Sequence, residues 1–525
     1  MSNRHVRPII RASFFYWLAV TLAMFSSIMQ TARADTVPNP CTGFGTNPVS
    51  LTAQLPSSFS SRVQTNANCT AWQQFIYANW AADPNNPGYP NTKVPASDFG
   101  NPTKSDLTVW ESFLQSSEVF TDSPTNALAR SSKNRPLVLQ QVSKTGALDL
   151  SAIGQASGEW LTDQRGNLVY YDIRLNPDEV DYIYNANPTG KNLTWAQGQL
   201  ACAQGLGGLR LPSGYGDDIT CDGKTRTFGG NVGAMEIKAA WIKLPEDGSL
   251  NYRYLTSQAV LVEPGADDIA VQQSNTVTVG LVGLHIIRHL PGASQMLWST
   301  FEQVDNAPDA GTGMVNLPPN PNRKPQSSYT FFNPDCDPEQ DIYYQCKPNW
   351  TPDMKAQTPC ETESPRNPAN CIPYSAPAQV NRVTPVVSTS NDVNAYVWSL
   401  LSADSVFNYY RLIDVQWPNN STSVKAGSTT PLTTGDITPS DSTRIVANTT
   451  LETYVQSKDS CMDCHKYASI AKPAQTDVIA AFNKLKLAGN KAPRTMLSIG
   501  ASKDKSEQSY GAYYSFIFSA STIRK

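Results

Sequence analysis

Ten cysteines are spread over the 525-residue chain, and the compartment in which the protein folds decides how they are used. The N-terminus has the pattern of a secretory signal peptide: a basic start, an apolar stretch from about Phe14 to Met29, and the small-residue cleavage site Ala32-Arg33-Ala34. Cleavage there would remove residues 1–34 and leave Asp35 as the first mature residue; the alternative is an uncleaved membrane anchor. We therefore predict an exported protein whose cysteines are exposed to an oxidising compartment.

Eight of the cysteines stand apart from the other two and form four pairs of near neighbours along the chain. Such an even set is typical of disulfides in an exported protein, although the sequence alone leaves the connectivity open. Nearest-neighbour pairing is the simplest hypothesis, and it gives Cys41–Cys69, Cys202–Cys221, Cys336–Cys346 and Cys360–Cys371. Each bridge would contribute roughly 2–4 kcal/mol by restricting the unfolded chain.

The remaining cysteines, Cys461 and Cys464, are separated by two residues, and His465 follows directly. This C-x-x-C-H spacing is the attachment pattern of c-type haem. Two thiols on one side of a tight turn can add across the two haem vinyl groups, and the next residue can place its imidazole on the iron. The alternatives are a redox dithiol and half of a zinc site. No second C-x-x-C is present in the sequence to complete a zinc site, so we predict one covalent haem c with His465 as proximal ligand.

The sequence leaves the sixth iron ligand open. Met496 follows His465 by 31 residues, beyond a helical pattern at 477–486, which is where small cytochromes c place a methionine ligand. The alternative role of Met496 is core packing. His285 and His289 lie in a run rich in β-branched residues that predicts a strand, so they would be ~13 Å apart and only one could reach the iron, His285 being the weaker alternative ligand. An open sixth site would instead indicate peroxide or oxygen chemistry.

The rest of the chain predicts a mixed α+β fold. Aromatic residues at helical spacing, Trp72 to Trp80 and Trp110 to Leu114, indicate two buried helices, and Asn176-Pro177-Asp178-Glu179 is typical of a helix start. Period-two patterns predict strands at 168–175, 234–244, 252–262, 276–290, 295–303, 395–401 and 409–417. Because no long helices separate most of these strands, we expect an antiparallel sheet rather than βαβ units.

We divide the mature chain into four parts. Residues 35–315 form a β-rich domain with N-terminal helices, and 316–380 form a disulfide-stapled connector that holds 13 of the 38 prolines. Residues 381–439 supply return strands of the large domain, and 440–525 form a small, mainly α-helical, cytochrome c-like haem domain. In that last part Thr449 and Glu452 have the spacing of a capping box, which predicts a short helix leading to the haem motif.

The net charge of the chain and the absence of certain sequence motifs exclude several classes of binding partner. The formal charge is −3, and removal of four arginines with residues 1–34 leaves 37 basic against 44 acidic residues, or −7. No basic field is present for a nucleic acid, and no later apolar stretch is long enough to span a membrane. Dinucleotide, phosphate-loop and serine-hydrolase motifs are also absent from the sequence. The expected partner is therefore a redox protein or a small-molecule electron donor or acceptor, and whether the protein is an enzyme stays open.

Several stretches resemble an otherwise uncharacterised group of exported bacterial proteins, the cytochrome c family in the broad sense. These stretches are Val109-Trp110-Glu111-Ser112-Phe113, Asp172-Ile173-Arg174-Leu175-Asn176, Gly233 to Trp241, Gly283-Leu284-His285, Trp298-Ser299-Thr300-Phe301-Glu302, and Ala447-Asn448-Thr449-Thr450 leading to Cys461. The resemblance implies one covalent haem and no particular activity.

We expect a periplasmic or secreted monohaem c-type cytochrome that transfers electrons. One alternative is a haem-containing oxidoreductase, peroxidase-like or a dehydrogenase with a haem relay, whose substrate site lies in the large domain. Another is a binding module in which the haem acts as a sensor.

Overall fold

An eight-stranded sheet organises the computed structural model, in which the chain from Pro40 onward forms one unit. The structure describes residues 37–42, 49–59, 63–104, 106–120, 136–139, 160–214, 216, 218–262, 276–291, 293, 296–325, 327–337, 339, 346–349, 358–359, 371–372, 375–417, 445–457, 460–461, 465, 468, 470–471 and 510–518. The predicted signal peptide, Cys464, Met496 and the predicted helix at 477–486 lie outside these residues.

The strands of the large sheet follow the order β12-β9-β8-β6-β5-β3. Neighbours in this order are antiparallel, as is the pair β7–β8, whereas β4 pairs with β7 in parallel. The bounds are β3 Leu114–Gln115, β4 Leu137–Leu139, β5 Tyr170–Leu175, β6 Met235–Lys243, β7 Thr256–Leu261, β8 Thr276–Arg288, β9 Leu297–Gln303 and β12 Tyr410–Gln416. The predicted antiparallel sheet in a mixed α+β fold is therefore confirmed, with one parallel pair added.

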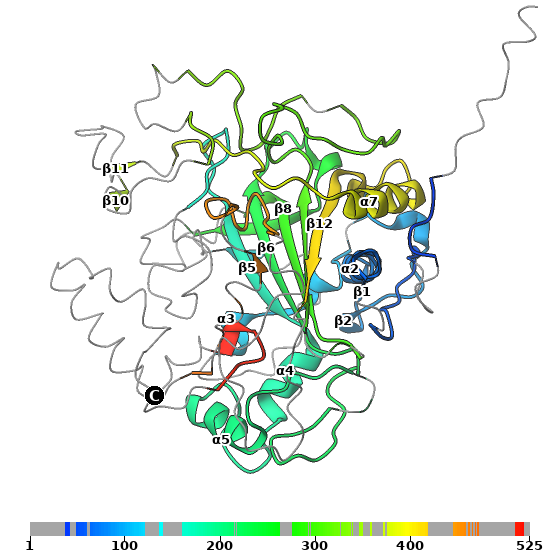
Figure 1. The fold of residues 1–525 in the computed structure, drawn as a ribbon, viewed down its shortest axis with the longest axis vertical. Helices are drawn as coiled ribbons and strands as arrows, with labels where there is room; N and C mark the ends of the chain where they lie inside the picture. The colour runs from blue at the N-terminus through cyan, green and yellow to red at the C-terminus, as the bar shows by residue number, and fades with distance from the viewer. Residues whose placement is uncertain are drawn as a thin grey trace, which may run out of the picture. The chain divides into compact units, whose positions relative to one another are not determined.

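The helices and short strands lie around this sheet (Figure 1). The helices are α2 Gln64–Ala78, α3 Ser116–Val119, α4 Pro177–Asn185, α5 Ala196–Leu206 and α7 Ser388–Leu400, and the short strand pairs are β1 Ala82–Asp83 with β2 Asn86–Pro90 and β10 Thr358–Pro359 with β11 Cys371–Ile372. Short 3-10 turns occur at Ala96–Asp98, Trp110–Ser112, Asn251–Arg253 and Val406–Tyr409. The side chain of Asn176 accepts a hydrogen bond from the Glu179 backbone N–H, which confirms the predicted start of α4.

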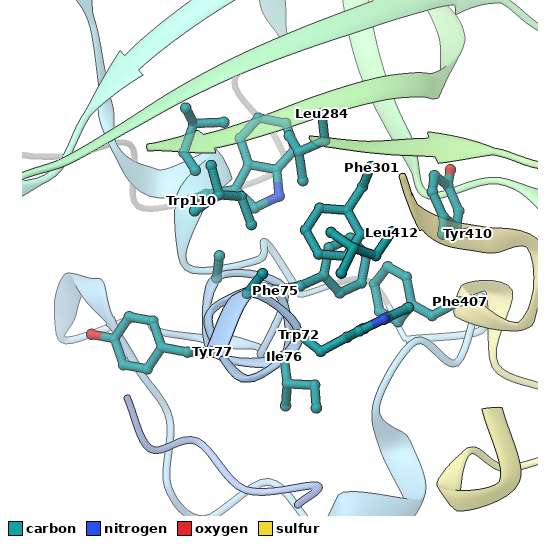
Figure 2. Close-up of a cluster of buried hydrophobic side chains, with 14 of the residues drawn as sticks. Trp72, Phe75, Ile76, Tyr77, Trp110, Leu284, Phe301, Phe407, Tyr410 and Leu412 are labelled. Carbon is teal, nitrogen blue, oxygen red and sulfur yellow. The ribbon is translucent and has the colours of Figure 1, made fainter. Parts of the chain in front are cut away.

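One face of the sheet is covered by α2 and α7. Side chains alternate along β6, so Ile237 and Trp241 point to this face and join an aromatic core. Figure 2 shows Trp72 and Phe75 of α2 directed at Phe301, and the rings of Phe75 and Phe301 lie 4.5 Å apart. The Trp72 indole N–H donates a hydrogen bond of 2.9 Å to Asn394 of α7, which ties the two helices together. The predicted helix around Trp72 is thus confirmed as a core element.

We call the opposite side of the sheet the C-terminal face; it carries Glu236, Lys238, His285, Trp298 and Glu302. The register places Lys238 opposite His285 on β8, and His285 opposite Thr300 on β9. Residues opposite each other in an antiparallel pair share a face. The chain after 445 covers this face, and the residues nearest to it come from 446–451 and 510–518.

Two predicted elements are wrong. The segment Trp110 to Leu114 is a 3-10 turn followed by β3, because the carboxylate of Glu111 accepts hydrogen bonds of 3.0 Å from both the backbone N–H and the hydroxyl of Thr108 and closes a tight turn. In the predicted strand 395–401, residues 395–400 lie in α7, and Leu401 is the C-cap of that helix. There Val393, Val397 and Trp398 share one buried helix face, a spacing that a short apolar run does not distinguish from a strand.

The predicted short helix after Thr449 is also absent: the described residues 445–457 form turns. Glu452 does accept a backbone hydrogen bond, but from the N–H of Asn448 at 2.9 Å, one residue before the predicted cap. The asparagine in turn accepts hydrogen bonds from Thr450 N–H and Oγ1, and these bonds favour a compact turn over a helix.

Three of the predicted disulfides are formed: Cys41–Cys69, Cys202–Cys221 and Cys336–Cys346. The fourth pair lies outside the described residues because Cys360 is not among them. These bridges are compatible with an extracytoplasmic, oxidising compartment. Among the described residues, no helix combines the length and the apolar character needed to cross a membrane.

Glu302 on β9 is the centre of a buried charge network. Its carboxylate forms ion pairs with Arg382 and with Arg411 on β12, and it accepts hydrogen bonds from the N–H and the hydroxyl of Thr449, at 3.0 and 2.8 Å. Burial by itself would raise the pKa of Glu302, and the two guanidinium groups lower it below its usual range. The carboxylate therefore stays ionised and joins three distant segments of the chain.

We predict that Glu302→Gln lowers the free energy of unfolding by about 3–5 kcal/mol, because two buried guanidinium groups lose their counter-charge. Chemical denaturation measures this loss. The control is Glu246→Gln, whose exposed side chain pairs with Lys243, and which we expect to change stability by less than about 0.5 kcal/mol. Equal effects of the two substitutions would contradict the prediction.

Candidate functional site

Two residues of the predicted haem motif, Cys461 and His465, lie against the C-terminal face of the sheet. Both of these residues have helical backbone. Cys461 is half-buried and packs against the apolar cluster that contains Ile287 and Trp298. Of the predicted site residues, the structure therefore describes Cys461, His465 and His285, whereas Cys464 and Met496 lie outside the described residues.

His465 is held by the backbone near the C-terminus. Its Nδ1 lies 2.7 Å from the carbonyl oxygen of Tyr514. A carbonyl oxygen can only accept, so Nδ1 carries the proton and donates, and the lone pair of the neutral ring is on Nε2. Among the described residues, nothing forms a hydrogen bond to Nε2.

Aromatic rings surround this imidazole. The ring centroids of Trp298 and Phe516 lie 5.7 and 5.2 Å from that of His465. Burial among them lowers the pKa of His465 to about 4; the hydrogen bond to Tyr514 opposes this shift, and Lys238 and His285 reinforce it. The imidazole is therefore neutral at pH 7, the form that binds a metal.

These features fit an axial haem ligand. A histidine ligand usually donates its second ring N–H to a carbonyl or carboxylate, which orients the ring and leaves one nitrogen for the metal, as His465 does. Among the described residues, no group of three or more His, Cys, Asp or Glu side chains could hold a metal ion. A haem iron sets no such requirement, because the porphyrin supplies four of its ligands.

The chain that leads to the motif is fixed on the sheet by hydrogen bonds. Asn448 donates to the hydroxyl of Thr300 at 3.0 Å and to the carbonyl of Phe301 at 2.8 Å. The Tyr171 hydroxyl donates to the carbonyl of Thr450 at 2.9 Å. At Gly283 a β-carbon would collide with the Thr450 side chain, so glycine allows the segment to lie directly on β8.

The two candidate histidines of the large domain differ in their surroundings. His285 lies on β8, as predicted, and its Nε2 is 3.4 Å from a carboxylate oxygen of Glu452. It faces the same side of the sheet as Trp298, and its proximity contributes to the lowered pKa of His465. His289, by contrast, places Nδ1 2.8 Å from the carbonyl oxygen of Leu211, and its Nε2 faces the hydroxyl of Tyr513 at 3.2 Å. Both of its nitrogens are used, which makes it a hydrogen-bonded core histidine.

Sequence reasoning did not identify Trp298, Tyr514 and Phe516 as neighbours of the motif. The aromatic density of 510–518 was the signal available, since this stretch contains three tyrosines and two phenylalanines. The carbonyl of Tyr514 leaves no trace in a residue pattern, because any amino acid could supply it. Finding it requires the fold.

Two buried carboxyl groups lie beside this region. Glu179 of α4 and Glu236 of β6 interact with each other, and Glu236 also contacts the Ser515 side chain. Burial raises the pKa of Glu236 to about 7, with hydrogen bonds from Ser515 and Glu179 opposing the shift. Burial and the charge of Glu236 raise the pKa of Glu179. The folded protein therefore retains protons that the unfolded chain releases.

Because the pKa of Glu236 rises from 4.5 to about 7 on folding, we expect the free energy of unfolding to fall as pH rises through this window. Between these two pKa values the folded state binds more protons than the unfolded state. Each unit of difference between the folded and unfolded pKa corresponds to about 1.4 kcal/mol of stability. Denaturation curves at several pH values measure the slope. Glu236→Gln should reduce the slope, and Glu236→Gln with Glu179→Gln should remove it, because both carboxyl groups have raised pKa values. Glu339→Gln, a change at an exposed residue, should leave the slope unchanged. A slope that survives the double substitution would refute the assignment to this pair.

Comparisons with known proteins add no relative to this site: no family model, no curated protein and no solved structure matches the chain.

Proposed function

We propose that the protein is a periplasmic monohaem c-type cytochrome that transfers electrons. In this proposal Cys461 and Cys464 carry the haem through thioethers, and His465 is the proximal iron ligand. Residues 440–525 form the haem-binding part. The observation that supports the proposal best is the state of His465: a neutral ring, oriented through Nδ1 by the Tyr514 carbonyl, four residues after a half-buried cysteine.

Haem c, when bound, supplies an iron that exchanges one electron. The chain's own residues would set the conditions of that exchange. The Tyr514 carbonyl fixes the ring orientation and increases the basicity of Nε2. The rings of Trp298 and Phe516 exclude water and lower the local dielectric, which disfavours the more highly charged oxidation state. The partner would be a redox protein or a small-molecule donor or acceptor, and the three disulfides are compatible with an exported location.

We predict that the protein, produced with a cytochrome maturation system, gains the mass of one haem and a c-type visible spectrum. Replacement of both motif cysteines, Cys461→Ser with Cys464→Ser, should abolish covalent attachment entirely, since no thiol remains for the vinyl groups. Mass spectrometry under denaturing conditions and spectra with and without dithionite measure this. Cys336→Ser with Cys346→Ser is the control, because it removes a disulfide and leaves the motif. A colourless protein without added mass would refute the proposal.

For the sixth ligand we propose Met496. We predict that Met496→Ala abolishes the ferric sulfur-to-iron charge-transfer absorption, because a thioether ligand is its source. The control is His285→Ala, which should leave the absorption intact, since His285 Nε2 faces the carboxylate of Glu452.

If His285→Ala changes the low-spin spectrum and Met496→Ala does not, the sixth ligand is His285. A high-spin spectrum that shifts with cyanide or peroxide in the unaltered protein would favour the haem oxidoreductase over the electron carrier.

A further inference from the structure

A tight turn with two tyrosines at its centre lies beside His465. The backbone N–H of Ser515 donates to the carbonyl of Ala512 at 3.0 Å, and the residues between them, Tyr513 and Tyr514, have φ angles of 57° and 68°. Two successive positive φ angles are typical of type I′ turns, in which Gly, Asn and Asp dominate. A side chain makes this conformation unfavourable, so it persists only where the surroundings hold it.

The hydroxyl of Tyr513 supplies one such constraint. His289 must donate from Nδ1 to the Leu211 carbonyl, 2.8 Å away, because a carbonyl cannot donate. Burial lowers the pKa of His289, so the ring is neutral and its Nε2 is unprotonated. This nitrogen accepts from the Tyr513 hydroxyl at 3.2 Å and also lies 3.4 Å from the carbonyl oxygen of Ala293. The two rings also make an edge contact with centroids 5.1 Å apart. The turn is therefore tied to the backbone just after β8 and to the loop after α5.

The next residue of the same turn faces the motif. The carbonyl of Tyr514 accepts the Nδ1 proton of His465 at 2.7 Å. The Tyr514 ring lies edge-on to Trp298 with centroids 5.7 Å apart, and Trp298 also borders the His465 ring. The carbonyl of Tyr514 therefore orients His465, and the neighbouring residue Tyr513 constrains the backbone that carries this carbonyl.

We propose that Tyr513 and His289 are positioning residues for His465. Their hydrogen bond holds the strained turn so that the Tyr514 carbonyl stays aimed at His465 Nδ1. The redox consequence of this inference rests on the proposed function. A firm Nδ1–H···O bond makes the imidazole a stronger donor, which stabilises the oxidised iron and lowers the reduction potential.

The first test is the reduction potential of the haem-loaded Tyr513→Phe protein. This variant keeps the ring and loses the hydroxyl. We expect haem attachment to survive. At a fixed solution potential, the ratio of oxidised to reduced haem should fall about threefold, which equals a rise in the reduction potential of about 28 mV for one electron. The matched control is Tyr410→Phe, which also deletes a buried hydroxyl, one that donates to Leu281 at 2.8 Å in the core on the helix-covered face.

A double-mutant cycle separates positioning from general loosening. His289→Gln should shift the potential in the same direction, and the double variant should shift it no further than the larger single change, because both act through one hydrogen bond. Additive shifts, no shift in Tyr513→Phe, or an equal shift in Tyr410→Phe would overturn the inference.

A second readout needs no haem. Nitrogen-15 NMR of the full-length protein reports which nitrogen of His465 is protonated. We expect the Nδ1–H tautomer in the unaltered protein and a mixture of tautomers in Tyr513→Phe. If the protein carries no haem but shows this change, the proposed function fails and the positioning role stands. The tautomer is read on haem-free protein, because iron bound at Nε2 would itself hold the proton on Nδ1. If the protein carries haem and the potential does not respond, the positioning role alone fails.

Discussion

The carboxylate of Glu302 is the interaction on which the arrangement of the molecule depends. It lies on β9, next to the edge strand β12, and pairs with Arg411 of β12 and with Arg382 of the loop before α7. It also accepts both polar hydrogens of Thr449. An ionised group at this depth requires several partners. Satisfying it brings the chain after 445 onto the C-terminal face, and the segment that contains Cys461 and His465 follows from that point.

The two faces of the sheet differ in the kinds of side chain that they carry. The helix-covered face holds rings in close contact around Phe75 and provides stability by apolar burial. The C-terminal face mixes charged, polar and aromatic side chains, among them Glu302 with its two arginines and Trp298 beside His465. Sites built on such rigid strands keep their geometry better than sites built on loops alone. His465 belongs to the covering chain, but Trp298 of β9 and the turn at Tyr514 fix its surroundings.

Local patterns were sufficient to predict most of the strands, α4 and three disulfides, because these depend on alternation, capping and near-neighbour cysteines. They failed where a polar side chain closes a turn in place of a helix. Glu111 does this by accepting hydrogen bonds from Thr108, and Asn448 does it before the motif by accepting them from Thr450. The motif itself could be recognised from spacing. Its surroundings could not be predicted, because Trp298 is more than 160 residues away in the sequence from both His465 and Tyr514, the residues that its ring contacts.

The order in which the chain is made has a consequence for the C-terminal face. The strands β5 to β9 are complete well before residues 510–518 leave the ribosome, yet those last residues pack on Trp298 and contact Glu236. A product truncated before Tyr510 would carry every strand of the sheet and still expose aromatic and apolar side chains to water. Such a fragment would be prone to aggregation and proteolysis, because the apolar surface that 510–518 cover would face water.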